Sequence, residues 1–452
     1  MPNDPTRTDR RTFLGAAAGT TGAAFADGPP GVAADPPPPV PAPRATSGDA
    51  VEPDWAERIT VTVGSKTGDL VGTDDRVLQA AVDLVARYGG GTVRVLPGTY
   101  RLRNAIHLRP NLRLIGTGGD TVLVKEPSVT SKLVEDSDWY DQEVTLADAR
   151  GFRLGDGVCL RARNPHNGGQ VVLKRTLVAR SGSRFKLDRP LRDNLWRMGD
   201  ATAATLFPLL SGDGVSDVWI EGLCLDGNRP NNANLDGNYA GCIFLQDCAR
   251  FTVRRVIARN YNGDGISWQI CHDVTVEDCH SHGHAGLGLH PGSGSQRPVI
   301  RNNRLDDNEI GLFFCWGVRG GRAEGNRITD SRATGLSIGH RDTDNLIRDN
   351  EIRGSGRVGV LFRPERGAAF APHRTRLENN RVVDSGPDTG VAVDIQGEVG
   401  DLHLVGNTLR ETRGSARRVG VRIAAGVGAV RLDGNRIDGF ATPVDDGRKR
   451  VP

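Results

Sequence analysis

The chain has 452 residues, of which 37% are hydrophobic and 25% are charged, and its formal net charge at pH 7 is +3. This near-neutral balance, together with the lack of a basic stripe with interleaved aromatic residues, argues against a nucleic-acid-binding protein. The seven cysteines contain no Cys-x-x-Cys pair, so we expect no structural zinc site.

The first 26 residues have the pattern of an export signal. Residues 9–15 read DRRTFLG, which is typical of a twin-arginine signal, and a candidate cleavage site follows at residues 24–26, with residues 32–34 as a second option. The apolar run between them is too short and too rich in glycine to span a bilayer. A Pro-rich linker occupies residues 27–53. We therefore expect a secreted, extracellular protein exported by the twin-arginine pathway, without a membrane span.

Residues 54–125 predict an N-terminal cap and the first strands of a solenoid. Residues 73–88 have the pattern of an amphipathic helix, with Thr73 as its cap and one apolar face made of Val77, Ala81, Leu84 and Val85. Three glycines at residues 89–91 end it. Such a helix can cover the open apolar end of a stack of strands.

The residues after this helix carry a family resemblance. Residues 90–100 read GGTVRVLPGTY and residues 112–118 read LRLIGTG, and coils punctuated by glycine and asparagine follow. This order resembles the secreted right-handed β-helix proteins of the pectate lyase and polygalacturonase superfamily. The resemblance covers about residues 60–125 and 211–440, and it implies the fold rather than one reaction.

Residues 126–210 do not follow the pattern of the coils. Alternating apolar residues at 152–158, 176–179 and 185–187 predict a small β insertion that projects from the solenoid. Such a module can form the wall of a groove.

Residues 211–440 repeat one phrase, a glycine followed by apolar residues at every second position. It occurs at residues 265–269, 286–290, 311–315, 335–339, 359–363, 390–394 and 420–424, at a spacing of roughly 21–31 residues. A period of two indicates strands. Another short strand in most repeats begins at an asparagine, and we expect a coil-to-coil ladder of Asn303, Asn326, Asn350, Asn380, Asn407 and Asn435. We therefore predict an all-β protein, a right-handed parallel β-helix with a capping helix, a β insertion and a C-terminal tail at 441–452.

The alternation also predicts which side chains face outward. One exterior column is expected to hold Gln269, His290, Cys315, Gly339, Arg363 and Asp394, and a second Ser267, Gly288, Phe313 and Ser337. Polar residues beside small and aromatic ones are typical of a sugar-binding groove, and an ordinary solvated face is the alternative. Inside the coils, Cys248 and Cys271 occupy equivalent places, where we expect stacked thiols rather than a disulfide.

Rare and reactive residue types cluster over about four neighbouring coils of this face, and five of the ten histidines lie between residues 272 and 290. The candidate catalytic residues are Asp264, His290, Asp342, Asp344 and Arg341. The candidate substrate-binding residues are Gln269, His284, Trp316, His340, Arg363 and Glu309. Three alternating histidines, His280, His282 and His284, suggest either a metal ligand set or, as we prefer, a hydrogen-bonding surface.

Two reaction types fit these residues. Asp264 resembles the aspartate of the N-x-D-G phrase of polygalacturonase-like enzymes, and hydrolysis needs a second carboxyl group, for which Asp342 or Asp344 is the best partner. Elimination needs a base and a cation or Ca²⁺ that neutralises the carboxylate of a uronic acid. Because no lysine occurs between Lys186 and Lys449, Arg341, Arg363, His290 and His340 are the candidates on the solenoid.

The sequence therefore predicts an exported carbohydrate-active enzyme that cleaves glycosidic bonds of a polysaccharide or oligosaccharide, with hydrolysis slightly favoured. The alternatives are a polysaccharide lyase or C5-epimerase acting on uronic acids, and a non-catalytic glycan-binding β-helix of the cell surface. We expect no obligatory cofactor and no resident metal, with Ca²⁺ as an option for a lyase. The oligomeric state is left open.

Overall fold

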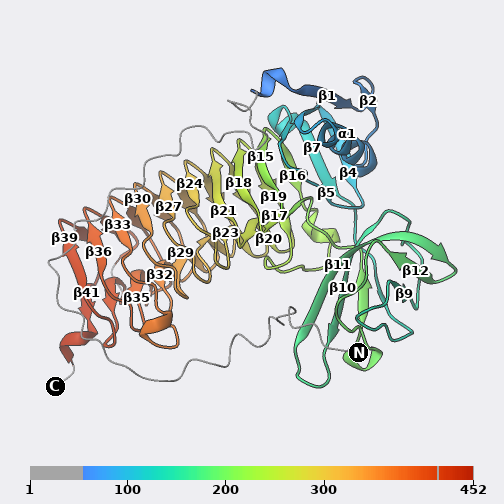
Figure 1. Cartoon of the computed structure of the whole chain (residues 1–452). Helices are drawn as coiled ribbons and strands as arrows, with labels where there is room; N and C mark the ends of the chain where they lie inside the picture. The colour runs from blue at the N-terminus through green and yellow to red at the C-terminus, as the bar shows by residue number, and fades with distance from the viewer. Residues whose placement is uncertain (1–53, 415–416, 451–452) are drawn as a thin grey trace, which may run out of the picture. The chain divides into compact units, whose positions relative to one another are not determined.

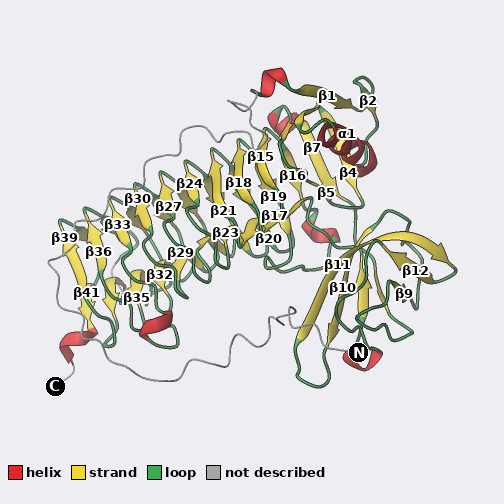
Figure 2. Ribbon diagram, viewed as in Figure 1, coloured by secondary structure: helices red, strands yellow, loops and turns green. Residues whose placement is uncertain are grey.

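The computed structural model describes residues 54–414 and 417–450. The export signal and the linker predicted within residues 1–53 lie outside the described residues. Among the described helices, none combines the length and the apolar character needed to cross a membrane. The chain winds into successive coils, each of which adds one strand to each of three parallel sheets (Figures 1 and 2).

Sheet 1, the first strand of each coil, has 13 strands in the order β2 (Leu70–Val71), β1 (Ile59–Gly64), β3 (Gly91–Val95), β6 (Leu112–Ile115), β15 (Ser216–Glu221), β18 (Ala249–Arg254), β21 (His272–Glu277), β24 (Val299–Arg301), β27 (Arg322–Glu324), β30 (Leu346–Arg348), β33 (Arg376–Glu378), β36 (Leu402–Val405) and β39 (Val430–Asp433). Sheet 2 has 11 strands: β4 (Gly98–Leu102), β7 (Thr121–Lys125), β16 (Cys224–Asp226), β19 (Ile257–Arg259), β22 (His280–His282), β25 (Arg304–Asp306), β28 (Arg327–Thr329), β31 (Glu351–Arg353), β34 (Arg381–Val383), β37 (Thr408–Arg410) and β40 (Arg436–Asp438).

Sheet 3 follows in each coil and also has 11 strands: β5 (Ile106–His107), β14 (Leu210–Asp213), β17 (Gly241–Gln246), β20 (Asp264–Gln269), β23 (Leu287–Pro291), β26 (Ile310–Phe313), β29 (Thr334–Ile338), β32 (Val358–Phe362), β35 (Val391–Ile395), β38 (Val419–Ile423) and β41 (Thr442–Asp446). Its inward side chains form ladders, such as the fully buried Ile266, Leu289, Leu312, Leu336 and Val360. Each buried aliphatic side chain stabilises the stack by roughly 1.5–3 kcal/mol. The predicted parallel β-helix is confirmed.

The asparagine ladder also forms as expected. Nδ2 of Asn326 donates to Oδ1 of Asn350 and to the carbonyl oxygen of Ile300, each at 2.9 Å. The same pattern recurs from Asn303 to Asn435, and the ladder asparagines from Asn303 to Asn407 are buried. Because a buried amide without partners is costly, this ladder favours one register of the coils.

Helix α1 (Asp75–Arg87) covers the N-terminal end of the stack, packing against β1 and β3. Its cap is Asp74, whose side chain accepts hydrogen bonds from the backbone N–H groups of Arg76 and Val77, so the expected cap at Thr73 is wrong by one residue. The buried face is correspondingly shifted, and it consists of Leu78, Ala81, Val82 and Val85. Leu84, which was expected inside, is exposed.

The β insertion is an antiparallel sheet with the order β8 (Thr130–Lys132), β13 (Thr202–Ala204), β10 (Gly157–Arg163), β11 (Gln170–Ser181), β12 (Arg184–Leu187) and β9 (Glu143–Thr145). It has its own small core, which includes Phe152, Leu160 and Phe185. Arg103, which follows β4, forms a two-point ion pair with the buried Asp156 of the insertion, with both N···O distances at 2.7 Å. The insertion is thereby anchored to the first coils of the solenoid.

Candidate functional site

Most of the predicted site residues lie on the outward face of sheet 3 and in the turns that follow its strands, whereas His284 and Glu309 precede β23 and β26. The register of two strands differs by two residues from the one that the repeated phrase predicts. In β23, Ile266 pairs with Leu289 rather than with Leu287. In β35, Val360 pairs with Val393 rather than with Val391. His290 therefore lies beside Ser267 rather than Gln269. The error arises at Gly286 and Gly288, which offer two registers with similar patterns. The one adopted buries Leu289 and leaves Leu287 partly exposed.

A buried polar pair joins β20 to β23. Nδ1 of His290 lies 2.8 Å from Oδ2 of Asp264, so the two side chains share a hydrogen bond. Oδ1 of Asp264 accepts from the N–H of Leu287 at 2.9 Å. Ser267 donates from Oγ to the carbonyl oxygen of Gly237 at 2.6 Å, which fastens the loop before β17 over the pair. Both members are only 3% exposed, so the pair is oriented but covered.

A second buried carboxylate, Asp342, lies in the turn after β29. Three backbone N–H groups donate to it, those of Gly317 and Val318 at 2.9 Å and that of Gly339 at 2.8 Å. Its Oδ2 also lies 3.4 Å from Nη2 of Arg363. Burial raises the pKa of Asp342 to about 6, and Arg363 and the three N–H groups act in the opposite direction.

An accessible group of side chains lies next to these residues, in the turns after β26, β29 and β32. The His340 ring stacks on the indole of Trp316, with centroids 4.5 Å apart and planes inclined by 24°. Nδ1 of His340 lies 3.3 Å from Oε2 of Glu365. The Arg341 guanidinium lies 4.3 Å from the centroid of Phe370 and forms no ion pair with a carboxylate within the described part of the chain. Trp316 is 58% exposed and Arg341 is exposed as well, whereas the side chains of His340 and Glu365 are 14% and 15% exposed.

Ring and ion-pair contacts connect the buried pair to the accessible group. The His290 ring meets Phe313 edge to face, with centroids 5.5 Å apart, and the Arg363 guanidinium lies 4.2 Å from the centroid of Phe313. Arg363 Nε is 3.8 Å from Oε1 of Glu365. We call this set the sheet 3 row: Asp264, His290, Phe313, Arg363, Glu365, His340 and Trp316.

Besides Asp342 and Arg341, four further predicted site residues lie outside the row. Asp344 is paired with Arg374 at 2.6 Å, and Glu309 lies 3.5 Å from Arg332. His284 is fully buried, its Nδ1 accepting from the N–H of Tyr261, and burial lowers its pKa to about 3. Gln269 is buried as well, and its amide bridges Ser267 and the backbone of Ser293.

The metal alternative for the three histidines does not fit the structure. His280 and His282 stack on each other with ring centroids 4.2 Å apart, whereas His284 turns into the core. Over residues 54–414 and 417–450, no group of three or more His, Cys, Asp or Glu side chains is arranged to hold a metal ion. The cysteines in this part of the chain are free thiols, as expected for Cys248 and Cys271.

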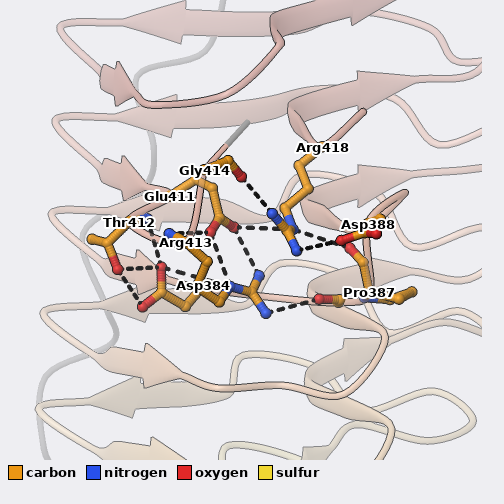
Figure 3. Close-up of polar contacts among 9 residues, drawn as sticks. Asp384, Pro387, Asp388, Glu411, Thr412, Arg413, Gly414 and Arg418 are labelled. Carbon is orange, nitrogen blue, oxygen red and sulfur yellow. Dashed lines mark hydrogen bonds and ion pairs between the residues drawn. The ribbon is translucent and has the colours of Figure 1, made fainter. Parts of the chain in front are cut away.

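Another polar cluster, between β34 and β38, is internally paired. Figure 3 shows the carboxylate of Glu411 facing two guanidinium groups, with Arg413 Nη2 at 2.8 Å and Arg418 Nε at 3.6 Å. Arg418 also pairs with Asp388 at 2.9 Å. Glu411 and Arg418 are both buried, and their charges are compensated by each other, which is typical of a structural ion-pair network.

Sequence reasoning overlooked two contributors to this face. Phe370 belongs to a short 3₁₀ helix, Ala368–Phe370, in a long turn, and a turn residue has no periodic signal that assigns it a neighbour. Lys174 comes from the insertion, yet its Nζ lies 3.7 Å from the ring centroid of Phe244 in β17. The absence of lysine between Lys186 and Lys449 therefore does not keep lysine away from sheet 3.

Comparison with known proteins supports the fold. A family profile described as "Right handed beta helix region" matches residues 241–437, which agrees with the predicted handedness. The mannuronan C5-epimerase AlgE1 of Azotobacter vinelandii is 25% identical over 315 residues, or 68% of this chain. The match spans only 16% of that relative's length.

Two solved structures have the same fold. The A-module of the mannuronan C-5 epimerase AlgE4 of Azotobacter vinelandii superposes with a TM-score of 0.52 at 16% identity, over 84% of this chain and 97% of that one. The surface protein and adhesin PfbA of Streptococcus pneumoniae reaches a TM-score of 0.50 at 12% identity, over 82% and 94% of the two chains. At these identities the likeness extends to the fold alone.

Proposed function

We propose that the protein is a carbohydrate-active enzyme that binds an acidic polysaccharide along the sheet 3 row and removes the C5 proton of a uronic acid unit. The observation that carries this proposal is the group in which Glu365 orients His340 beside the exposed Trp316 and beside Arg341, which forms no ion pair among the described residues. The mannuronan C5-epimerases among the relatives, at 24–25% identity, support the same class of substrate.

Each side chain of the accessible group has a role in this reaction. The indole of Trp316 stacks against a sugar ring, and the Arg341 guanidinium binds the uronic acid carboxylate through two parallel hydrogen bonds. Nε2 of His340 accepts the C5 proton, while Glu365 stabilises the imidazolium that forms. Negative charge develops on the carboxylate as the C5–H bond breaks, and Arg341 stabilises that charge.

The fate of the electron pair left at C5 decides the product. Return of a proton to the opposite face gives the C5 epimer. Departure of the O4 substituent instead breaks the glycosidic bond and leaves a C4–C5 double bond. Both outcomes begin with one proton abstraction, so His340, Arg341 and Glu365 serve the first step of either reaction. The second step differs, because an epimerase needs a proton donor on the opposite face of the sugar and a lyase needs one for the departing O4 oxygen.

Hydrolysis, which the sequence slightly favoured, has less support. Hydrolysis needs two carboxyl groups that flank the scissile bond. Both oxygens of Asp264 and of Asp342 are bonded to donors of the protein itself, and both side chains are buried. Asp344 is held by Arg374. The C5-epimerase relatives do not point to hydrolysis either.

A substrate panel with matched variants tests the proposal. Polymers of mannuronate, guluronate and galacturonate, and a neutral glucan, are incubated with the protein, with and without Ca²⁺. The products are followed at 235 nm for double bonds, by NMR for epimers and by assay of new reducing ends. We expect turnover of an acidic polymer, and H340Q should lower kcat by roughly 10²–10⁴-fold. H272Q, on the outward face of β21, is the matched control and should leave the rate unchanged.

Two results would contradict the assignment. If H290Q abolishes turnover while H340Q retains it, the buried pair is the catalytic one. If reducing ends appear without absorbance at 235 nm or epimers, the reaction is hydrolysis. Secretion by the twin-arginine pathway is a separate proposal, carried by residues 9–15, and replacing both arginines with lysine should abolish export.

A further inference from the structure

A cavity of about 300 Å³ lies between the insertion and the first coils. Lys174 and Arg175 of β11 line it on one side, and Ser211 of β14 and Phe244 of β17 line it on the other. Ser211 pairs with Phe244, Phe244 with Ser267, and Ser267 with His290, so these residues form one outward column of sheet 3. The cavity therefore lies in line with the sheet 3 row, on its N-terminal side.

Lys174 is the main charged group of this cavity. Its Nζ donates to the carbonyl oxygen of Tyr239 at 2.5 Å and lies 3.7 Å from the ring centroid of Phe244. An ammonium group has three N–H donors, so the carbonyl and the ring leave one donor for a ligand. No carboxylate of the described chain lies within ion-pair distance of it. Burial lowers the pKa of Lys174 to about 8, so the group is still mainly charged at neutral pH.

The surroundings add to this positive charge. Arg175 donates to the backbone carbonyls of Lys174, Pro190 and Leu191, and it forms no ion pair among the described residues. Arg189 and Asp188 face each other at 4.0 Å, and Asp213 is the second carboxylate in the lining. The lining thus contains three cationic side chains, Lys174, Arg175 and Arg189, and two carboxylates, Asp188 and Asp213. A partly buried cation without a carboxylate partner destabilises the free protein. An anionic ligand would compensate its charge.

We propose that this cavity is a second subsite, in which Lys174 binds the carboxylate of another uronic acid unit of the same glycan. The proposal rests on the function proposed above and deepens it, because the pairing of Ser211, Phe244, Ser267 and His290 places the cavity on the same side of sheet 3 as the row. From β17 to β29, which precedes His340, there are four strand steps, or roughly 19 Å. The hydroxyl of Ser211 and the amide of Gln246 also line the cavity and can bond to sugar hydroxyl groups. The insertion thereby selects acidic glycans that are long enough to reach both places.

Titration calorimetry with defined oligosaccharides tests this subsite. The probes are oligomers of mannuronate, guluronate and galacturonate, with a neutral glucan oligomer of equal length as the control ligand. The variants are K174M, which removes the charge, K174R, which keeps it, and K186M, in which an exposed lysine of β12 is replaced. Loss of one hydrogen bond from a charged group should raise the Kd of the acidic oligomer roughly 10- to 100-fold in K174M. K186M should bind as the unmodified protein does, and K174R should retain most of the affinity. Circular dichroism at the working temperature confirms that each variant is folded.

The outcomes separate this subsite from the proposed reaction. If the unmodified protein shows no turnover but binds the acidic oligomer in a Lys174-dependent manner, the subsite stands and the reaction fails. If turnover occurs and K174M changes neither Kd nor KM, the reaction stands and the subsite fails. The subsite is also refuted if the protein binds no acidic oligomer, or binds the neutral oligomer equally well.

Discussion

Lys125, the last residue of β7, connects three parts of the chain around the end of the stack. Its Nζ donates to Oδ1 of Asn232 at 2.6 Å, to the carbonyl oxygen of Thr205 at 2.8 Å and to that of Glu126 at 3.2 Å. Thr205 belongs to the insertion, and Asn232 belongs to the loop that leads to β17. The side chain is 1% exposed, and burial lowers the pKa of Lys125 to about 7.

This shift makes the stability of the protein depend on pH. A lysine with a pKa of about 7 when folded and 10.5 when unfolded binds more protons in the unfolded state across that interval. The free energy of unfolding therefore rises with pH through this window, by about 5 kcal/mol over its full width. Between pH 7 and 8.5 the gain is about 1.5 kcal/mol, because the folded group is already half deprotonated at pH 7.

Urea unfolding of the unmodified protein and of K125M, between pH 7 and 8.5, measures this effect. K125M has no group that titrates here, so the stability difference should shift by about 1.5 kcal/mol in favour of the unmodified protein as the pH rises. K186M serves as the matched control, because its exposed lysine should give a difference that does not change with pH. A difference for K125M that is flat across the window would refute the reasoning, and it would mean that the three oxygens hold Lys125 as an ammonium in the folded protein.

Two other buried charges give measurable predictions. Burial raises the pKa of Asp342 to about 6 from 3.8, so the folded state binds more protons between these values and this carboxyl group lowers stability as the pH rises, by up to about 3 kcal/mol. Denaturant titrations from pH 4 to 6 should show this fall in the unmodified protein and lack it in D342N, and equal slopes would contradict it. E411Q leaves Arg413 and Arg418 without their shared buried countercharge (Figure 3), and it should lower the free energy of unfolding by roughly 3–5 kcal/mol. Calorimetry measures that loss against D388N, whose carboxylate is exposed, and similar Tm values would contradict it.

The coils could be predicted from the sequence because their stability is local and repeated. Each coil buries the same positions against its neighbours, so the alternation of apolar residues and the recurrent asparagines appear directly in the sequence. Asn326 and Asn350 show this, since each bonds to the equivalent residue one coil away. The predicted register was wrong at Gly286 and Gly288. Each of these glycines is followed by a leucine, so either one can begin the repeated pattern of a glycine and alternating apolar residues.

The residue types of the candidate site could be predicted from the sequence, but the contacts between its side chains could not. The clustering of His340, Arg341 and Trp316 in successive turns predicts that these side chains lie together, and His340 and Trp316 do stack, because turns stack as the strands do. The pairing of His340 with Glu365 depends on the course of a turn, which no periodicity describes. Lys174 is a still harder case, because its place beside Phe244 depends on how the insertion docks on the first coils.

These differences follow from how a solenoid presents side chains. Each coil offers one outward position per column, so a column alone can supply a line of single residues but not a group that surrounds a ligand. The turns place further side chains beside such a column. His340, for example, has its carboxylate partner, Glu365, in the turn after β32. The insertion supplies a wall, and it brings a lysine to a sheet whose own repeats contain none. In the function we propose, recognition of an acidic polymer therefore depends on elements outside the repeat, and the repeat holds those elements at a fixed spacing.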